Sequence, residues 1–289
     1  MFKRALKMKS ILRSLAPPLL LTSLKKATSR RPKYRTYLDA AAVCPKDAYQ
    51  HRELVNVVVD KNIAFKQTLS TKNVLEFSDI RTLIGLGLSK TGYSLNVIDF
   101  GGGGGYHYTV AAAALGGLTD LKWNVVETTA MVNESRRLAN DRLKFFDNIA
   151  EAANDLPSVD LVFTSSALQY CPNPLAFLKQ LIDVNAKHLY ITRTPFSNGD
   201  DDIFSTQVSN LSANGPGPLP SGYVDKKITY PISYISQSKV EAALNEHYHI
   251  QFKTLEDQAI HLVGNTEIDM YGYFCVLKKL VRDNSGLRS

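Results

Sequence analysis

The sequence predicts an α/β protein built on a mostly parallel, doubly wound sheet with helices on both faces. From Asn96 onward, short apolar runs typical of buried strands alternate with helix-like segments. Five consecutive glycines connect the first of these strands to the helix that follows it. The chain has 289 residues, of which 44% are hydrophobic, so it can bury a sizeable core and still carry appendages.

The individual elements follow from local patterns. Residues 37–95 are expected to be mostly helical, with helices over 47–66 and 78–88. The alternating region then predicts strands at 96–100, 121–127, 144–147, 159–165, 188–194, 249–255 and 272–279, and helices at 108–115, 129–143, 174–184 and 238–245. This order is typical of a parallel sheet whose crossover connections are helices.

Residues 196–236 interrupt the alternation. The segment is rich in Gly, Pro, Ser and Asn, and its Gly-Pro-Gly-Pro run at 215–218 excludes regular structure there. An insertion after the fifth strand would lie over the carboxyl ends of the strands, where ligands bind in open α/β sheets. We therefore expect a lid or substrate-recognition segment, with a plain surface loop as the alternative.

The basic charge of the chain belongs to its N-terminal tail. The formal net charge is +7, but residues 1–35 hold eleven of the 34 Lys and Arg and no acid. The remainder has 23 basic against 27 acidic residues, so it lacks the excess of positive charge that is typical of nucleic-acid-binding proteins. The expected organisation is a basic, partly amphipathic tail (1–36), a helical segment (37–95), a ligand-binding domain (96–282) and a C-terminal tail (283–289).

The tail suggests two alternatives. Its apolar runs are far shorter than the roughly 20 residues of a membrane span, and Pro17-Pro18 breaks the pattern of a signal peptide. Either residues 1–35 make peripheral contact with anionic lipid, or they are a solvated, disordered leader. The three widely spaced cysteines fit neither a disulfide framework nor a metal site, so we expect a cytoplasmic protein, peripheral at the inner face of the membrane if the tail binds lipid.

The spacing of the glycines in the turn decides between three known ligand-binding motifs. A dinucleotide fingerprint needs glycine five residues after the first, where Tyr106 stands instead. A P-loop ends in Gly-Lys-Ser/Thr, which is absent. The pattern acid-x-Gly-x-Gly-x-Gly is complete, with Asp99, Gly101, Gly103 and Gly105. The remaining alternative is a merely flexible glycine tract.

This pattern resembles motif I of the class I S-adenosylmethionine (SAM) dependent methyltransferases. The resemblance implies SAM as cofactor and the Rossmann-like doubly wound sheet of that class, mostly parallel with an antiparallel last strand. It also implies that Asp99 accepts from the ammonium of the cofactor, while the glycines lie against its methionine portion and ribose.

Further cofactor contacts are expected at the ends of the next strands. A carboxylate at Glu127 would accept from both ribose hydroxyls. Asp147 and Asn148 follow the third strand, where the fold often contacts the adenine amino group, and Phe145 and Phe146 would pack on the ring. After the fourth strand, Ser165, Ser166 and Gln169 would lie near the methionine end. Each of these polar residues also has an ordinary explanation as a turn or helix-start residue.

Three residues are candidates for the acceptor side and catalysis. His107, just past the glycines, would serve as a general base for a hydroxyl acceptor, or simply start a helix. Tyr170 would contact the acceptor. Arg193 would bind an anionic or sugar-like acceptor, or form an ion pair with the acidic run 200–202. Most of the rate of methyl transfer can come from proximity and orientation alone.

Five stretches make a narrower resemblance, to methyltransferases of bacterial surface-polysaccharide and O-antigen gene clusters. They are VIDFGGGGGYHY (97–108), WNVVE (123–127), SSALQY (165–170), TRTPF (192–196) and TYPISYIS (229–236). The resemblance implies O-methylation of a sugar or glycan intermediate. A non-catalytic binding module of an envelope-biosynthesis assembly, or an NAD-dependent enzyme, are the alternatives, and the oligomeric state stays open.

Overall fold

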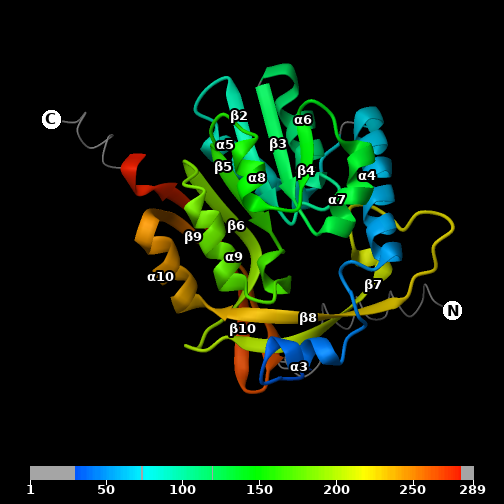
Figure 1. The fold of residues 1–289 in the computed structure, drawn as a ribbon, viewed down its shortest axis with the longest axis vertical. Helices are drawn as coiled ribbons and strands as arrows, with labels where there is room; N and C mark the ends of the chain where they lie inside the picture. Colours follow the sequence, from blue (N-terminus) through cyan, green and yellow to red (C-terminus); the bar gives the residue numbers. More distant parts are fainter. Residues whose placement is uncertain (1–29, 73, 119, 281–289) are drawn as a thin grey trace, which may run out of the picture.

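The computed structural model describes residues 30–72, 74–118 and 120–280, and its central feature is one twisted sheet (Figure 1). The strands lie in the order β1-β9-β10-β6-β5-β2-β3-β4, with β7 and β8 attached beside β6. Their bounds are β1 Arg30–Arg31, β2 Ser94–Phe100, β3 Asp120–Val126, β4 Leu143–Phe146, β5 Leu161–Ser165, β6 His188–Ser197, β7 Ile203–Asn210, β8 Lys227–Ser236, β9 Tyr248–Val263 and β10 Thr266–Leu277.

The pairing of the strands confirms the expected fold class. β4, β3, β2, β5 and β6 are parallel neighbours, whereas the last strand, β10, is antiparallel to both β6 and β9. The result is a Rossmann-like, doubly wound sheet that is mostly parallel. Because β3 and β5 flank β2 on opposite sides, the strand order reverses at β2, and such a reversal places a ligand site at the carboxyl ends of the strands.

Helices cover both faces of the sheet. One core packs α8, α9 and α10 on the sheet, and the other packs α5, α6 and α7 on the opposite face. α4 packs against α7 through Val55, Val59 and Met131. The helical bounds are α3 Tyr37–Ala42, α4 Arg52–Lys72, α5 Ile80–Ser89, α6 Tyr106–Leu115, α7 Thr129–Ser135, α8 Ile149–Asn154, α9 Pro174–Asp183 and α10 Gln237–His247, with short 3-10 turns at Phe77–Asp79, Gly116–Leu118, Arg136–Leu138, Leu168–Tyr170 and Leu211–Ala213.

The segment 196–236 differs from the expected loop. It contains the antiparallel hairpin of β7 and β8, and the Gly-Pro-Gly-Pro run lies in the connection between these two strands. β8 also pairs with the last two residues of β6, so the hairpin starts at the carboxyl end of the parallel sheet. In Figure 1, β8 crosses the lower end of the sheet with α3 below it.

Two further expectations need correction. The helix expected over 129–143 ends after Ser135 and a 3-10 turn, because Asn140 accepts from the backbone N–H groups of Arg142 and Leu143 and forms a turn into β4. Residues 30–36, expected to belong to the tail, are joined to the fold. β1 pairs with β9, and Tyr34 bridges to Phe204 in β7. Residues 1–29 and 281–289, and therefore most of both expected tails, lie outside the described residues.

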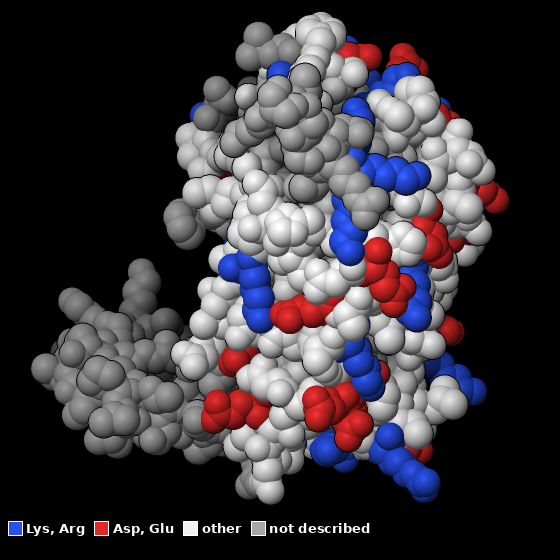
Figure 2. Space-filling view, turned by 90° about the vertical axis from the view of Figure 1, so that its left-hand side faces the viewer, with Lys and Arg blue, Asp and Glu red and all other residues white. Residues whose placement is uncertain are grey.

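Charges of both signs are mixed on the surface that Figure 2 presents. Ion pairs join Lys144 to Asp155 at 2.7 Å and Lys253 to Glu241 at 2.9 Å. Within the described part of the chain, no helix is both long and apolar enough to span a bilayer.

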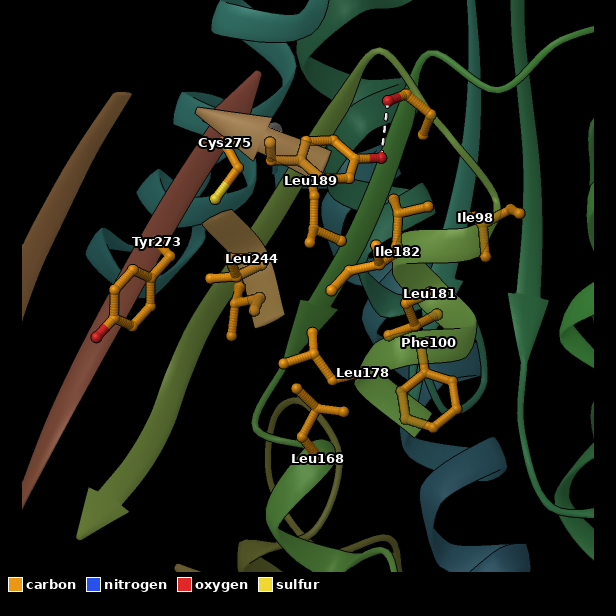
Figure 3. Close-up of a cluster of buried hydrophobic side chains, with 14 of the residues drawn as sticks. Ile98, Phe100, Leu168, Leu178, Leu181, Ile182, Leu189, Leu244, Tyr273 and Cys275 are labelled. Atoms are coloured by element: carbon orange, nitrogen blue, oxygen red, sulfur yellow. Dashed lines mark hydrogen bonds between the residues drawn. The ribbon is translucent and has the colours of Figure 1, made fainter. Parts of the chain in front are cut away.

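Helix α9 illustrates how local sequence produces the core. Asn173 caps it by accepting from the Ala176 N–H at 3.2 Å, and Pro174 occupies the first turn, where its missing N–H costs nothing. Leu178, Leu181 and Ile182 then repeat at helical spacing and are fully or almost fully buried. Figure 3 shows these side chains facing the sheet among Ile98, Leu168, Leu189 and Leu244.

Truncation of Leu178 to Ala should destabilise the fold by about 2–5 kcal/mol, since it removes buried methyl groups and leaves a cavity. Urea or thermal unfolding of the two proteins measures this difference. Leu38→Ala is the matched control, because Leu38 is 77% exposed, and it should change the stability by less than about 0.5 kcal/mol. Equal losses for both variants would contradict this description of the core.

Candidate active site

A cavity of about 1370 Å³ lies at the carboxyl ends of the parallel strands. One wall consists of the glycine turn and the residues that follow β3, β4 and β5. The rest of the lining comes from α4, which packs beside the glycine turn, from the end of β6 and from the hairpin with its connection at 213–218. The insertion therefore contributes directly to the cavity, as do all the predicted site residues except Asp99, Gly105, Phe145 and Phe146.

The conformation of the glycine turn follows the predicted spacing. Gly101, Gly103 and Gly105 have φ angles of +76°, +56° and +83°, a region that residues with a Cβ rarely adopt. The two glycines between them are required by close packing instead. A Cβ on Gly102 would lie 2.3 Å from Asp99 Oδ2, and one on Gly104 would lie 2.8 Å from Asn62 Nδ2. A flexible tract has no such requirements, so that alternative does not fit.

Asp99 differs from its expected role. It is fully buried, and its carboxyl group accepts from Trp123 Nε1 at 3.1 Å and lies 3.0 Å from His107 Nδ1. The backbone of Gly102 covers it on the side of the turn. Direct contact between Asp99 and a ligand ammonium does not fit this geometry. Instead, Asp99 joins β2, β3 and α6 beneath the turn.

Gly105 also has a role in packing rather than in the cavity. It is the residue before α6, and a Cβ there would lie 3.0 Å from Leu143 Cδ2. It therefore allows the close approach of α6 to β4 and contributes nothing to the cavity lining.

Glu127 connects the end of β3 to the glycine turn. Oε1 accepts from the Gly103 N–H at 3.1 Å, and Oε2 accepts from the Thr128 N–H at 2.9 Å. Burial raises the pKa of Glu127, and the negative charge of Asp99 adds to this effect, while the two backbone N–H groups oppose it. Each oxygen keeps a lone pair for a hydroxyl donor in the cavity.

The residues after β4 divide into two groups. Asp147 lines the cavity and accepts from Thr129 Oγ1 at 3.0 Å. Asn148 also lines it, but its side chain caps α8 by accepting from the N–H groups of Ala150 and Glu151. The expectation that Phe145 and Phe146 pack on an adenine ring does not fit, because both pack into the two hydrophobic cores.

Three polar residues after β5 reach the cavity. Ser165 ends the strand, and Ser166 adopts a left-handed φ of +58°. Gln169 is 3% exposed and donates from Nε2 to Ser166 Oγ at 2.9 Å, while its Oε1 has no partner among the described residues. Burial raises the pKa of nearby Cys171 to about 12, which keeps the thiol protonated and excludes it as a nucleophile.

Tyr170 belongs to a cluster of tyrosines in the cavity wall. Its ring lies 4.7 Å from that of Tyr49, which in turn stacks on Tyr230 of β8 at 4.3 Å. Tyr170 donates to Gln207 Oε1 of β7 at 3.3 Å. The hydroxyl of Tyr49 is buried without a partner in the described part of the chain, and burial raises its pKa.

Arg193 lines the cavity from a strained position in β6. Its φ is +53°, and the register with β10 shifts opposite it, between Tyr271 and Tyr273, so the strand bulges and re-aims a side chain there. The backbone N–H of Arg193 donates to Glu256 Oε2 at 3.0 Å. The alternative was an ion pair between Arg193 and the acidic run 200–202. Of that run, Asp202 pairs with Lys239 instead.

His107 lies in the first turn of α6 and reaches the cavity while remaining 7% exposed. Its ring packs edge-on against Phe163 at 4.8 Å, and its Nδ1 is engaged by Asp99. A histidine held at one ring nitrogen by a carboxyl group has a fixed ring orientation. This arrangement is chemically suited to proton transfer at Nε2.

The predicted site residues include none from α4 or β9, although the helices before the first strand were one expected cover for the pocket edge. Lys61 is 1% exposed and donates to the Ser212 carbonyl at 2.7 Å, and Tyr223 donates to Asp60 at 2.8 Å, so both contacts attach the insertion to α4. Glu256 of β9 binds Arg81, at 3.2 Å, and the hydroxyl of Thr192. A buried lysine and asparagine in an apolar helix face are the only signals that the sequence offers for α4.

Comparison with known proteins shows distant similarity in structure alone. No family model matches the chain, and no curated protein matches its sequence. Similar solved structures include an S-adenosylmethionine-dependent methyltransferase from Clostridium acetobutylicum ATCC 824 (11% identity, 74% of this chain and 97% of that one, TM-score 0.40). Others are a SAM-dependent methyltransferase from Aquifex aeolicus (16%, 71% and 96%, 0.37) and magnesium protoporphyrin IX methyltransferase from Synechocystis PCC 6803 with bound S-adenosylhomocysteine (13%, 71% and 89%, 0.40).

Gly102→Ala should destabilise the protein by about 1–3 kcal/mol, because the new methyl group displaces the buried carboxyl group of Asp99. Chemical unfolding followed by circular dichroism measures the loss. Gly117→Ala is the control, since a Cβ at Gly117 meets nothing within 4 Å. If both variants unfold at the same denaturant concentration, Asp99 is not held beneath the turn as described.

Proposed function

We propose that this protein is a SAM-dependent methyltransferase that methylates an oxygen of a sugar or glycan intermediate. The observation that carries the proposal is the hydrogen bond from the Gly103 N–H to the Glu127 carboxylate, at the point where the strand order reverses. This contact supports a ribose site, because Glu127 lies beside backbone that has no side chain to keep a ligand away. The five sequence stretches at 97–108, 123–127, 165–170, 192–196 and 229–236 support an acceptor from surface-polysaccharide biosynthesis in the bacterial cytoplasm.

The residues of the cavity fit such a cofactor. Gly101 and Gly103 would lie against its methionine portion and ribose, and Glu127 would accept from the ribose hydroxyls. Asp147 would accept from the adenine amino group. Ser165 and the unpartnered oxygen of Gln169 would lie toward the methionine end.

The cavity has room for a second ligand. Its volume of about 1370 Å³ exceeds the roughly 300–1,000 Å³ of a common small-molecule pocket. Tyr49, Tyr170 and Tyr230 offer aromatic faces and hydroxyls to a sugar ring, and Arg193 offers a cation. We infer an acceptor that combines a ring, hydroxyl groups and a negative charge.

When bound, SAM supplies an electrophilic methyl group. The protein would hold the acceptor oxygen close to it, and proximity and orientation can supply most of the rate. His107 would accept the proton of the acceptor hydroxyl at Nε2 as the methyl group passes to that oxygen; the S–C bond of the cofactor would break, leaving S-adenosylhomocysteine. Asp99 would hold the imidazole ring in place through its contact with Nδ1.

Glu127→Ala should weaken SAM binding by about 10- to 100-fold, because hydrogen bonds to an ionised group contribute roughly 1.5–3 kcal/mol each. Isothermal titration calorimetry measures the affinity. Glu134→Ala is the matched control, since Glu134 is the next acid along the chain and pairs with Arg137 outside the cavity.

NAD serves as the control ligand and should not bind. A wild-type protein that binds NAD but not SAM would refute the proposal. Formation of S-adenosylhomocysteine with glycan acceptors then tests turnover, and saturable SAM binding without turnover on any acceptor would favour the non-catalytic binding module.

SAM affinity should fall as the pH decreases toward the raised pKa of Glu127. The ionised form accepts from the ribose, so binding is strong above that pKa and is lost as the pH falls through it. The decline should begin above the pH expected for an ordinary glutamate, whose pKa is about 4.3. Calorimetry between pH 4.5 and 7.5 measures it. Glu127→Gln should bind weakly and without this decline, and an identical pH profile in that variant would assign the titration to another group.

A further inference from the structure

Asn62 of α4 places an unpaired acceptor beside the glycine turn. The residue is 3% exposed, and Nδ2 donates to the Val58 carbonyl at 2.8 Å. This donation fixes the orientation of the amide, since an oxygen in that position would repel the carbonyl. The side chain packs on Gly104, and Oδ1 has no hydrogen-bond partner among the described residues.

Gln169 presents a second acceptor of the same kind from the end of β5. Its Nε2 is engaged by Ser166, while Oε1 has no partner among the residues that the structure describes. Both amides line the same cavity. Leaving a buried acceptor unpaired costs about 1–3 kcal/mol, so two such oxygens in one cavity wall indicate a ligand that donates hydrogen bonds.

The carboxyl group of Asp99, beneath the turn, is not available to that ligand. Asp99 is fully buried beneath Gly102 and already accepts from Trp123 and faces His107. A cation that enters at the glycine turn therefore meets neutral amide oxygens rather than Asp99. An ammonium group has three N–H donors and can therefore donate to more than one amide oxygen.

We propose that Asn62 and Gln169 bind the ammonium of the cofactor's amino-acid portion, in the place that the motif pattern alone assigns to Asp99. The proposal rests on the proposed function, because it concerns the same cofactor. It adds α4 to the cofactor site, although this helix precedes the first strand of the parallel sheet.

The test compares two ligands that differ in the amino-acid portion. S-adenosylhomocysteine carries the ammonium, whereas 5′-methylthioadenosine shares the adenosine and the thioether but lacks it. Asn62→Leu should weaken S-adenosylhomocysteine binding by about 10- to 100-fold, as expected for a lost hydrogen bond to a charged group. The same variant should bind methylthioadenosine within about twofold of the wild type, because that ligand makes no use of the amide.

Two further variants complete the experiment. Gln67→Leu is the control, since Gln67 is an exposed amide of the same helix outside the cavity, and both affinities should be unchanged. Gln169→Met keeps the side-chain length without Oε1 and should repeat the selective loss, which also covers the case that Asn62→Leu folds poorly.

The outcomes separate the two proposals. A wild-type protein that binds neither ligand refutes the proposed function, and this inference with it. Wild-type binding of both ligands combined with unchanged S-adenosylhomocysteine affinity in Asn62→Leu and Gln169→Met refutes the inference alone. Equal weakening of both ligands also refutes it, since it assigns a general structural role to the amides.

Discussion

The buried carboxyl group of Asp99 is the constraint on which the site depends. A carboxyl group with no access to water must have polar partners, and Asp99 finds them in Trp123 of β3 and His107 of α6. These contacts fix the helix and the neighbouring strand relative to the end of β2. They also explain why the residue above the carboxyl group has to be Gly102. The buried contacts of Asp99 therefore determine the shape of the glycine turn.

Much of the fold was predictable from local patterns. The central strands β2, β3, β5 and β6 are buried on both faces, so each appears as a continuous apolar run. The hairpin of β7 and β8 escaped prediction because β7 is rich in polar residues, Pro231 interrupts β8, and a run of Gly and Pro separates the two strands. Helix α8 was missed because six residues are too few to show a periodicity.

The site was predictable where a residue's position along a strand determines its surroundings. Glu127, Asp147 and Ser165 lie at the carboxyl ends of parallel strands of one sheet and reach one cavity for that reason. Asp99 occupies a similar position, but its orientation depends on Trp123, which is distant in sequence, and no pattern encodes that contact. Asn62 belongs to a helix outside the alternating region, so only the packing of α4 on the turn shows that it reaches the cavity.

The construction of the cavity from two independent parts has a consequence for protein engineering. The ends of β2, β3 and β4 form one wall, whereas a single continuous segment between β6 and α10 supplies much of the other. Contacts such as those of Lys61 with the Ser212 carbonyl and of Tyr223 with Asp60 attach this segment without involving the glycine turn. Libraries that vary the hairpin alone can therefore reshape half of the cavity and leave the other half intact.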